Sequence, residues 1–504
     1  MDSANGWSKC KLGEVIEVAS GYAFKSADYL ESGIPIIRIS DIQNGKIDVG
    51  KSVRINQKID FEPFTIKKGE VLIAMSGATT GKIGIYNSSE KAYQNQRVGK
   101  LRPRPKSGIS NALIYYLLLF LKQKIVTISY GGAQPNISSK KIEGLPINLP
   151  PLPEQRMIVD KIEALFSQLD NAVANIMTAM RKLKVYRQAV LQQAFTGELT
   201  KKWREEHPDL PTGAELLETI KVEREERYQN QLRDWKQAVK AWEEAGKKGK
   251  KPTRPKKPVE VTPLSKEELE ALPELPGGWL WTSLGSVCSK IFDGTHFSPQ
   301  NFPSGKYKYI TAKNIKDGRL VLDNITYVSE KDHNEIYSRC DVKKGDVLYI
   351  KDGATTGRAC VNVLDEEFSL LSSVGVFRTN PSFIIPKFLE IYLNSEMTRQ
   401  RMLKNTAGVA ITRLTLVKLN KAEIVLVPYL EQQQIVGEVE RRMSVCDRVE
   451  GELEAALNRS GALRRSILKR AFEGRLLNER ELEEARRAPD WEPAEELLRR
   501  VGAE

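Results

Sequence analysis

Apolar side chains recur at every third or fourth position along two long stretches of the chain. The apolar positions of the first stretch are Ile158, Ile162, Leu165, Leu169, Val173, Ile176, Met180, Leu183, Tyr186, Val190 and Ala194. The second stretch is looser and covers residues 435–471. This spacing places an apolar stripe along one face of a helix, and Gly197 and Gly474 stand where a glycine commonly ends one. The pattern predicts two long helices that pair along their stripes, in preference to burial in separate cores.

Short apolar runs separated by turn residues precede each predicted long helix. Residues 34–39 and 71–75 are rich in apolar and β-branched side chains and are flanked by Gly, Asn or Ser, which is typical of strands. A shorter helix is expected over residues 111–124, with a counterpart over residues 387–403. This mixture of strands and single helices predicts an α+β domain ahead of each long helix.

The order of these elements is repeated because the sequence itself is repeated. Gly-Ala-Thr-Thr-Gly occupies residues 77–81 and again residues 353–357, an offset of 276. Other repeated pairs are Lys-Lys-Gly-acid at 67–70 and 343–346, Pro-x-x-Glu-Gln at 151–155 and 428–432, and Ala-Phe-x-Gly at 194–197 and 471–474. A tandem duplication can give one chain two similar surfaces in a pseudo-two-fold arrangement, which suits a symmetric or extended partner.

The duplication divides the chain into six segments. We predict α+β domains over residues 1–150 and 277–427, long helices over 151–200 and 428–476, and helical tails over 201–276 and 477–504. The first tail is strongly charged and ends in a Lys- and Pro-rich linker. No comparable stretch occurs in the second copy, so the role of the interval 221–275 stays open. The predicted fold class is α+β, with two tandem, pseudo-two-fold-related domains and two long helices.

Composition and charge favour a nucleic-acid partner only weakly. The formal net charge is +13, and residues 1–150 carry 21 Lys and Arg against 12 Asp and Glu. A field of this sign draws polyanions and can contact phosphates, although a basic balance more often serves solubility. The longest apolar run, residues 112–121, is shorter than the roughly 18 residues of a membrane span, so no membrane contact is expected. Five scattered cysteines predict reduced thiols and a cytoplasmic location.

Motifs that carry catalysis are missing from the sequence. Gly-Ala-Thr-Thr-Gly-Lys has one residue too few for a phosphate-binding loop, and Ile83 stands where Ser or Thr is required, so a tight turn is predicted. The three histidines, His207, His296 and His333, form no metal-ligand pair in the sequence. Methyltransferase tetrapeptides, dinucleotide loops and nucleophile elbows do not occur. We expect a binding or scaffolding role, with no catalytic residue, metal or cofactor held by this chain.

Polar, aromatic and basic side chains gather in predicted loops of both α+β domains. Asn, Gln and Arg can hydrogen-bond base edges in the major groove, although most surface Asn and Gln side chains only cap turns. The candidate DNA-contacting residues are Tyr22, Lys25, Arg38, Gln94, Asn95, Gln96, Arg97, Gln134, Asn136, His296, Lys313, Asn314, Ser372, Ser373, Thr412 and Arg413.

The duplicated layout and the Pro-x-x-Glu-Gln joint together resemble the specificity subunit of type I restriction–modification systems. The joint reads Pro-Leu-Pro-Glu-Gln-Arg-x-Ile-Val-x-Lys-Ile-Glu over residues 151–163, with a degraded copy at 428–432. The resemblance spans essentially the whole chain. It implies that residues 1–150 and 277–427 are target-recognition domains, each reading one half of a split DNA site. It also implies that the two long helices pair as an antiparallel coiled coil and set the distance between the half-sites.

The resemblance further implies partners and cofactors. The expected complex contains double-stranded DNA, two modification subunits that carry S-adenosylmethionine and methylate adenine, and two restriction subunits that use ATP and Mg²⁺. The specificity subunit of such systems has no active site, which fits the missing motifs.

Functions of other classes stay open at this point. A fused methyltransferase or nuclease component is disfavoured by the missing motifs. A coiled-coil adaptor that binds only proteins would share the helical layout, as would a subunit of a methylation-only or other anti-phage complex. Salt-sensitive DNA binding would separate a DNA-binding subunit from a protein-only adaptor.

Overall fold

The computed structural model describes residues 6–43, 45–130, 135–255, 257–258, 262–404 and 413–502. The chain forms two compact units: unit 1 comprises Met1–Thr178 and Leu453–Glu504, and unit 2 comprises Ala179–Glu452. Each unit contains one α+β domain, one end of each long helix and one tail. Each compact unit therefore combines segments from both copies of the repeat. The boundaries of the six consecutive segments predicted from the sequence remain a prediction.

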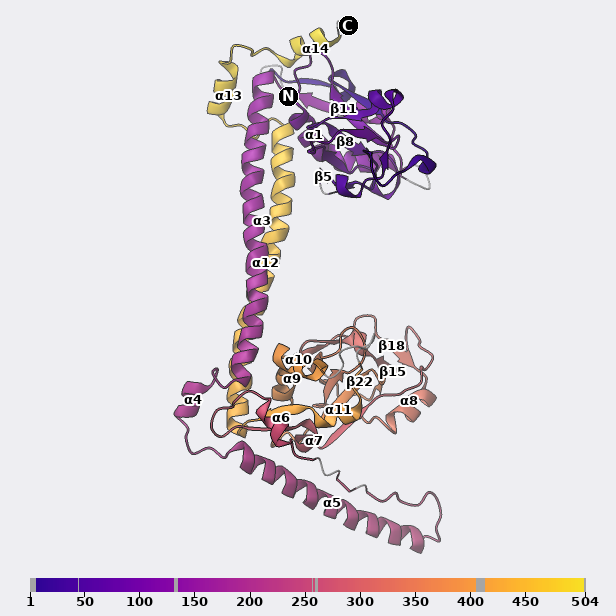
Figure 1. Ribbon diagram of the computed structural model, residues 1–504, viewed down its shortest axis with the longest axis vertical. Helices are drawn as coiled ribbons and strands as arrows, with labels where there is room; N and C mark the ends of the chain where they lie inside the picture. Colours follow the sequence, from indigo (N-terminus) through magenta and orange to yellow (C-terminus); the bar gives the residue numbers. More distant parts are fainter. Residues whose placement is uncertain are drawn as a thin grey trace. The chain divides into compact units, whose positions relative to one another are not determined.

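A six-stranded sheet forms the centre of the α+β domain in unit 1. Its order is β2-β11-β8-β9-β5-β4, and all four residues of β8 are buried. A second sheet, β6-β3-β10-β7, and the pair β1-β12 complete the domain, and α1 (Asn111–Ser129) packs against β8, β9 and β11 (Figure 1). The strands are β1 Ser8–Lys11, β2 Ile16–Ser20, β3 Ile34–Ile37, β4 Ile42–Gln43, β5 Gly45–Ile47, β6 Arg54–Ile55, β7 Thr65–Ile66, β8 Val71–Ala74, β9 Ile83–Ile85, β10 Ala92–Gln94, β11 Val98–Pro103 and β12 Pro146–Leu149.

The α+β domain of unit 2 repeats this strand pairing. β19 lies between antiparallel β22 and β20, as β8 lies between β11 and β9. β15 runs parallel to β21, as β3 runs parallel to β10. The sequence duplication is therefore a structural duplication. The strands are β13 Leu280–Ser283, β14 Lys290–Asp293, β15 Tyr307–Ile310, β16 Ile315–Lys316, β17 Arg319–Leu320, β18 Thr326–Val328, β19 Val347–Ile350, β20 Ala359–Val361, β21 Ser369–Leu370, β22 Val374–Arg378 and β23 Glu423–Leu426.

The shorter helix expected in each domain is continuous in one copy and broken in the other. α1 contains the predicted interval 111–124, whereas the interval 387–403 forms α9 (Pro386–Asn394) and α10 (Glu396–Lys404). Ser395 separates α9 from α10 in an extended conformation with ψ of 138°. Its hydroxyl accepts the backbone N–H of Thr398, which is the geometry of a helix N-cap.

By length and composition alone, α1 qualifies as a helix that could cross a membrane. This differs from the expectation based on the sequence, where the apolar run at residues 112–121 was too short to span a membrane. Ile114, Leu117 and Leu118 on α1 are at most 3% exposed, because they belong to the hydrophobic core of unit 1. That core accounts for the apolar character of the helix.

The two predicted long helices are α3 (Leu152–Phe195) and α12 (Tyr429–Phe472), each of 44 residues. Gly197 and Gly474 follow them with φ of +80° and +70°, the left-handed conformation in which glycine ends helices. The remaining α-helices of the described residues are α2 Ser139–Glu143, α4 Lys201–Glu205, α5 Gly213–Glu244, α6 Lys266–Glu270, α7 Leu284–Val287, α8 Glu330–Tyr337, α11 Leu416–Lys421, α13 Glu479–Arg486 and α14 Ala494–Gly502.

The predicted pairing of the long helices is confirmed within each unit. In unit 1 the early part of α3 packs against the late part of α12, where Asp170 forms an ion pair with Arg464. In unit 2 the late part of α3 packs against the early part of α12, where Arg187 lies 2.7 Å from Asp447. Early residues of one helix meet late residues of the other in both units, so the helices run antiparallel.

Candidate nucleic-acid interface

A buried glutamate fixes the start of each long helix. The Trp7 indole N–H donates to Glu154 at 2.7 Å, and the Trp279 indole N–H donates to Glu431 at 2.8 Å. Both carboxylates are at most 1% exposed. Burial raises the pKa of Glu154, against the hydrogen bond from Trp7, which acts to lower it. Neither contact was predicted from the sequence, although a Gly-Trp pair stands at residues 6–7 and 278–279 and is a further repeat.

The glutamine of the same motif completes the joint. Its side-chain N–H donates to a carbonyl just before the helix, from Gln155 to Pro150 at 2.8 Å and from Gln432 to Val427 at 2.9 Å. A buried amide in this position satisfies a backbone acceptor that the helix cannot reach. The Pro-x-x-Glu-Gln repeat is thus a structural joint between strand and helix.

Each tail ties to the start of the helix from the other copy. In unit 2, Glu431 also accepts from Arg204, which follows α3, at 2.7 Å. In unit 1, Lys161 near the start of α3 lies 2.5 Å from Glu481, which follows α12. These contacts explain why the compact units combine segments of both copies.

The repeated Gly-Ala-Thr-Thr-Gly segment is a tight turn after β8 and β19, as predicted. The second threonine hydroxyl donates back to the first glycine carbonyl, from Thr80 to Gly77 at 2.7 Å and from Thr356 to Gly353 at 2.6 Å. The two glycines have φ of +76° and +101°, which other residues rarely adopt. The same threonine contact therefore closes the turn in both copies.

Backbone hydrogen bonds draw several loops to one edge of the unit 1 domain. Met75, just after β8, donates its N–H to the Arg97 carbonyl at 2.9 Å and accepts from the Ile137 N–H at 2.9 Å. Gln96 donates its N–H to the Tyr22 carbonyl at 2.9 Å. The segments after β2, β8, β10 and α1 therefore meet at this edge.

The unit 2 domain makes the same three hydrogen bonds at equivalent positions. Lys351 donates its N–H to Ser373 at 2.9 Å and accepts from Leu414 at 2.9 Å, and Ser372 donates to Thr295 at 2.8 Å. Six positions at or beside these hydrogen bonds can be matched between the two units, and we call them the loop edge. In unit 1 they are Ser20, Met75, Ser76, Gln96, Arg97 and Asn136; in unit 2 they are Asp293, Lys351, Asp352, Ser372, Ser373 and Arg413.

The loop edge of unit 1 is nearly uncharged and hollow. It borders a cavity of about 690 Å³, which brings together the predicted site residues Gln96, Arg97 and Asn136. The hydroxyl of Ser76, which lines this cavity, is buried and has no hydrogen-bond partner among the described residues.

The loop edge of unit 2 carries a cluster of charges. The Lys351 ammonium lies 2.8 Å from Asp352 and 3.3 Å from Asp293, and its side chain is 3% exposed. Arg413 lies 3.7 Å from Asp352, and His296 lies 3.5 Å from Asp293. Four predicted site residues, His296, Ser372, Ser373 and Arg413, are close to this cluster. The same backbone edge thus presents different chemistry in the two units.

Burial removes two predicted site residues from the set that could read bases. Gln94 is 1% exposed, and its amide donates to the carbonyls of Ala19 and Val98 at 2.8 and 2.7 Å. Asn314 is also 1% exposed, and its amide donates to the Val321 carbonyl at 3.1 Å. Both amides are buried and hold loops in place, so we leave them out of the set proposed to contact bases.

The remaining predicted residues lie away from the cavity or outside the described part of the chain. Tyr22 is 40% exposed and packs against Phe24, Phe61 and Phe64. The side chain of Asn95 accepts the Arg97 N–H at 3.3 Å and shapes the turn. Lys25 and Lys313 are exposed, and Arg38 lies 3.6 Å from Asp41. Gln134 and Thr412 lie outside the described residues.

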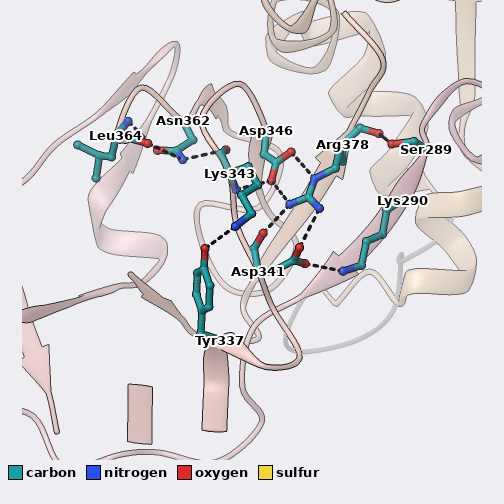
Figure 2. Close-up of polar contacts among 9 residues, drawn as sticks. All are labelled: Ser289, Lys290, Tyr337, Asp341, Lys343, Asp346, Asn362, Leu364 and Arg378. Carbon is teal, nitrogen blue, oxygen red and sulfur yellow. Dashed lines mark hydrogen bonds and ion pairs between the residues drawn. The ribbon is translucent and has the colours of Figure 1, made fainter. Parts of the chain in front are cut away.

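A charged network lies at the end of β19 and β22 opposite the loop edge of unit 2 (Figure 2). Arg378 donates two hydrogen bonds to Asp346, at 2.9 and 2.7 Å, and one to Asp341 at 3.1 Å. Although burial acts to raise it, hydrogen bonds from Lys290 and Arg378 lower the pKa of Asp341. Since Arg378 has its donors committed to these carboxylates, it serves the framework.

The same turn exists in unit 1 with a different cation. Asp346 accepts the Lys343 N–H at 2.8 Å, and Glu70 accepts the Lys67 N–H at 2.7 Å. In unit 1 the carboxylate is paired with Lys100, 3.5 Å away. The repeated Lys-Lys-Gly-acid sequence is therefore a structural turn.

Thiols and metal-ligating groups offer little chemistry in the described part of the chain. No group of three or more His, Cys, Asp or Glu residues there could hold a metal ion. All five cysteines are buried. Burial raises the pKa of Cys10, Cys288, Cys340 and Cys360 to about 12, so these thiols stay protonated and unreactive at neutral pH.

Comparison with known proteins gives one consistent result. The family model of the type I restriction modification DNA specificity domain matches residues 4–176 and 276–459. The chain is 26% identical to the type I restriction enzyme EcoBI specificity subunit of Escherichia coli, over 99% of this chain and 92% of that protein. It is 23% identical to the EcoKI specificity subunit of Escherichia coli (strain K12), over 99% of this chain and 95% of that protein.

A solved structure shows the same fold. A chain from a study of complex assembly and conformational transition of the type I R-M system has a TM-score of 0.63 and 18% sequence identity, and the match covers 94% of this chain and 98% of that one.

Proposed function

The chain belongs to the type I restriction–modification DNA specificity family, and we propose that it recognises a bipartite site in duplex DNA, one half-site per α+β domain. As a specificity subunit it is part of a type I restriction–modification complex. One observation carries the bipartite proposal: the loop edge is built twice on the same backbone hydrogen bonds, with different side chains at its six positions. Two readers of different sequences need this combination.

We place base contacts at the loop edges. Arg97 is exposed beside the unit 1 cavity, next to Gln96 and Asn136. In unit 2 the Arg413 side chain is 64% exposed. Arginine pairs bidentately with guanine and the amides of Gln and Asn pair with adenine, so both loop edges hold side chains that can discriminate bases. Ser372, Ser373 and His296 complete the proposed set in unit 2.

The long helices are the proposed scaffold for other subunits. Several of their apolar side chains are exposed in spite of the paired stripes; they are Met177, Val185, Tyr186, Val445, Val449 and Leu463. Exposed apolar groups of this kind favour protein–protein contact when they are contiguous. We propose that they bind two modification subunits, and that two restriction subunits complete the assembly in the cytoplasm. S-adenosylmethionine, ATP and Mg²⁺ belong to those partners, and this chain is non-catalytic.

Reconstitution with a modification subunit tests the proposal. The chain alone should not methylate DNA, and the chain with its modification subunit should methylate adenines in one split motif. Sequencing of methylated bases on a random plasmid library reads out the motif. Methyl transfer by the isolated chain would show that it is an enzyme. A complex that methylates without any motif would show that the chain is only a protein adaptor.

The ruler role of the paired helices stays a prediction. Four extra residues in each helix, near Ala174 and at the matching level of α12, add about one turn, or roughly 6 Å. Since DNA rises about 3.4 Å per base pair, the spacer between half-sites should lengthen by about one to two base pairs. An active complex with an unchanged spacer would contradict this role.

A further inference from the structure

A basic segment is held along the last turns of α5 in unit 2. After α5 (Gly213–Glu244) the chain turns back (Figure 1), and we call residues 247–258 the basic strap. The Trp242 indole N–H donates to the Gly249 carbonyl at 3.2 Å, and the Trp235 indole N–H donates to the Pro252 carbonyl at 3.0 Å. Two hydrogen bonds from one helix thus hold Gly249 and Pro252 in place, within a segment that the sequence alone indicated to be a linker.

The strap concentrates positive charge. It contains seven Lys and Arg and no Asp or Glu, in a chain whose net charge is +13. Its described cations Lys247, Lys248, Lys250, Lys251, Arg254 and Lys257 are exposed. Within the part of the chain that the structure describes, none of them forms an ion pair. Like charges held this close repel one another, and an anionic partner would relieve that repulsion.

Two aromatic rings position the cations without neutralising them. Lys251 lies 5.9 Å from the centroid of the Trp242 ring, and Arg254 lies 5.7 Å from the centroid of the Trp235 ring. Contacts of this kind orient a cation over the ring face. Both side chains remain exposed, and so their charged groups stay accessible to a ligand.

The strap is anchored to the α+β domain of unit 2 through α5. Leu216 and Ile220 on α5 are buried in the core that contains Trp279, and Arg224 donates to the Gly285 carbonyl at 3.0 Å. From Ile220 to Trp242 the helix advances about 33 Å at 1.5 Å per residue. One turn of duplex DNA is of similar length, about 34 Å, so the strap can reach a backbone segment about one turn from its anchor.

We propose that the basic strap binds the phosphates of duplex DNA outside the half-site read by unit 2. The contact is sequence-independent, because lysine ammonium groups meet phosphates as point charges. It adds affinity to a site whose sequence is read at the loop edges. The inference rests on the DNA-binding role of the family and adds a second contact surface to it.

Removal of four strap charges tests the proposal in the full chain assembled with its modification subunit. The test variant is Lys247→Gln, Lys248→Gln, Lys250→Gln and Lys251→Gln; its matched control is Lys221→Gln, Lys236→Gln, Lys240→Gln and Lys266→Gln in the same tail. Each lost phosphate contact should flatten the dependence of log K on log salt by about 0.9. We expect the test slope to fall by about 2 to 4 and the control slope to stay within about 1 of the original.

DNA length gives a second readout. Shortening the flank beyond the unit 2 half-site by about ten base pairs should weaken binding of the original chain at least several-fold. It should leave the strap variant unaffected, and shortening the other flank should weaken both proteins equally. The methylated motif should be the same for all variants, which separates a failure of the strap from a failure of the proposed function.

Three outcomes would overturn the proposal. One is a strap variant with the original salt slope and flank dependence. Another is a control variant that loses as much slope as the test variant, because general charge would then suffice. The third is a strap variant with unchanged DNA binding that no longer assembles with a partner subunit, which would assign the strap to an acidic protein surface.

Discussion

The two loop edges share a backbone and differ in charge. The edge of unit 1 has Ser20, Met75 and Ser76 where the edge of unit 2 has the ion-paired Asp293, Lys351 and Asp352. The backbone hydrogen bonds beneath them match to within 0.1 Å in length, at 2.9, 2.9 and 2.9 Å against 2.9, 2.9 and 2.8 Å. A duplicated framework can therefore hold two different recognition chemistries.

The contacts that support the fold repeat in the two units, whereas the side chains of the loop edge do not. The glutamate–tryptophan contact, the glutamine to carbonyl contact and the threonine turn occur in both units. Each satisfies a buried polar group, whose loss costs about 1–3 kcal/mol. Apart from the ion-paired Asp293, Lys351 and Asp352 of unit 2, which must change together, side chains at the loop edge satisfy few such groups, and several of them are exposed. They can change without loss of the fold, and recognition can change with them.

The largest expected effect comes from breaking the charge cluster of unit 2. Lys351→Met, which copies Met75 of unit 1, leaves Asp293 and Asp352 without their shared cation. Loss of one partner of a buried pair costs about 3 kcal/mol or more. The free energy of unfolding of unit 2, measured by chemical denaturation with hydrogen exchange as the probe, should fall by this amount.

The matched control copies the whole neutral arrangement of unit 1. The triple variant Asp293→Ser, Lys351→Met and Asp352→Ser should recover most of the stability, because no unpaired charge remains. A triple variant as unstable as the single one would mean that the two edges are not interchangeable frameworks.

A smaller effect is expected when single recognition side chains are compared. Arg97→Ala should weaken binding to DNA with both half-sites by about 1–3 kcal/mol and relax sequence preference at one position of one half-site. Ser373→Ala at the equivalent position of unit 2 should cost less, because a serine offers one hydroxyl and no charge. Arg319→Ala, away from the loop edge, is the control. Equal losses for Arg97→Ala and Arg319→Ala would point to general electrostatics.

The smallest expected effect is a change of stability with pH, which should occur in unit 2 because all three histidines lie there. His333 in unit 2 is 1% exposed, and burial lowers its pKa in spite of nearby Glu367. Below about pH 6.5 the unfolded chain binds a proton that folded unit 2 takes up less readily, so unit 2 should lose stability as pH falls.

Unit 1 contains no histidine, since the three in the chain are His207, His296 and His333. Hydrogen exchange at pH 7.5 and 5.5, corrected for intrinsic rates, should show a loss of protection in unit 2 that His333→Gln removes. An equal loss in unit 2 of the variant would assign the effect to other groups.

Periodicity and repetition predicted the long helices, their pairing and the duplicated α+β domains. Sequence distance hid the contacts that organise them: Trp7 and Glu154 are 147 positions apart, and the tails cross to the helix of the other copy. Sequence position also could not separate Gln94 from Gln96. Gln94 ends β10 and faces inward, whereas Gln96 lies in the exposed turn. Only packing distinguishes an amide that holds a loop from one that can meet a base.

Exchange of one recognition domain tests the central claim most directly. Residues 1–150 are replaced with the matching domain of a relative that has a different target, and the motif methylated by the reconstituted complex is determined by sequencing. Two independent edges on a repeated framework predict that one half of the motif changes while the other half and the spacer stay the same. A change in both halves together would contradict the assignment of one half-site to each domain.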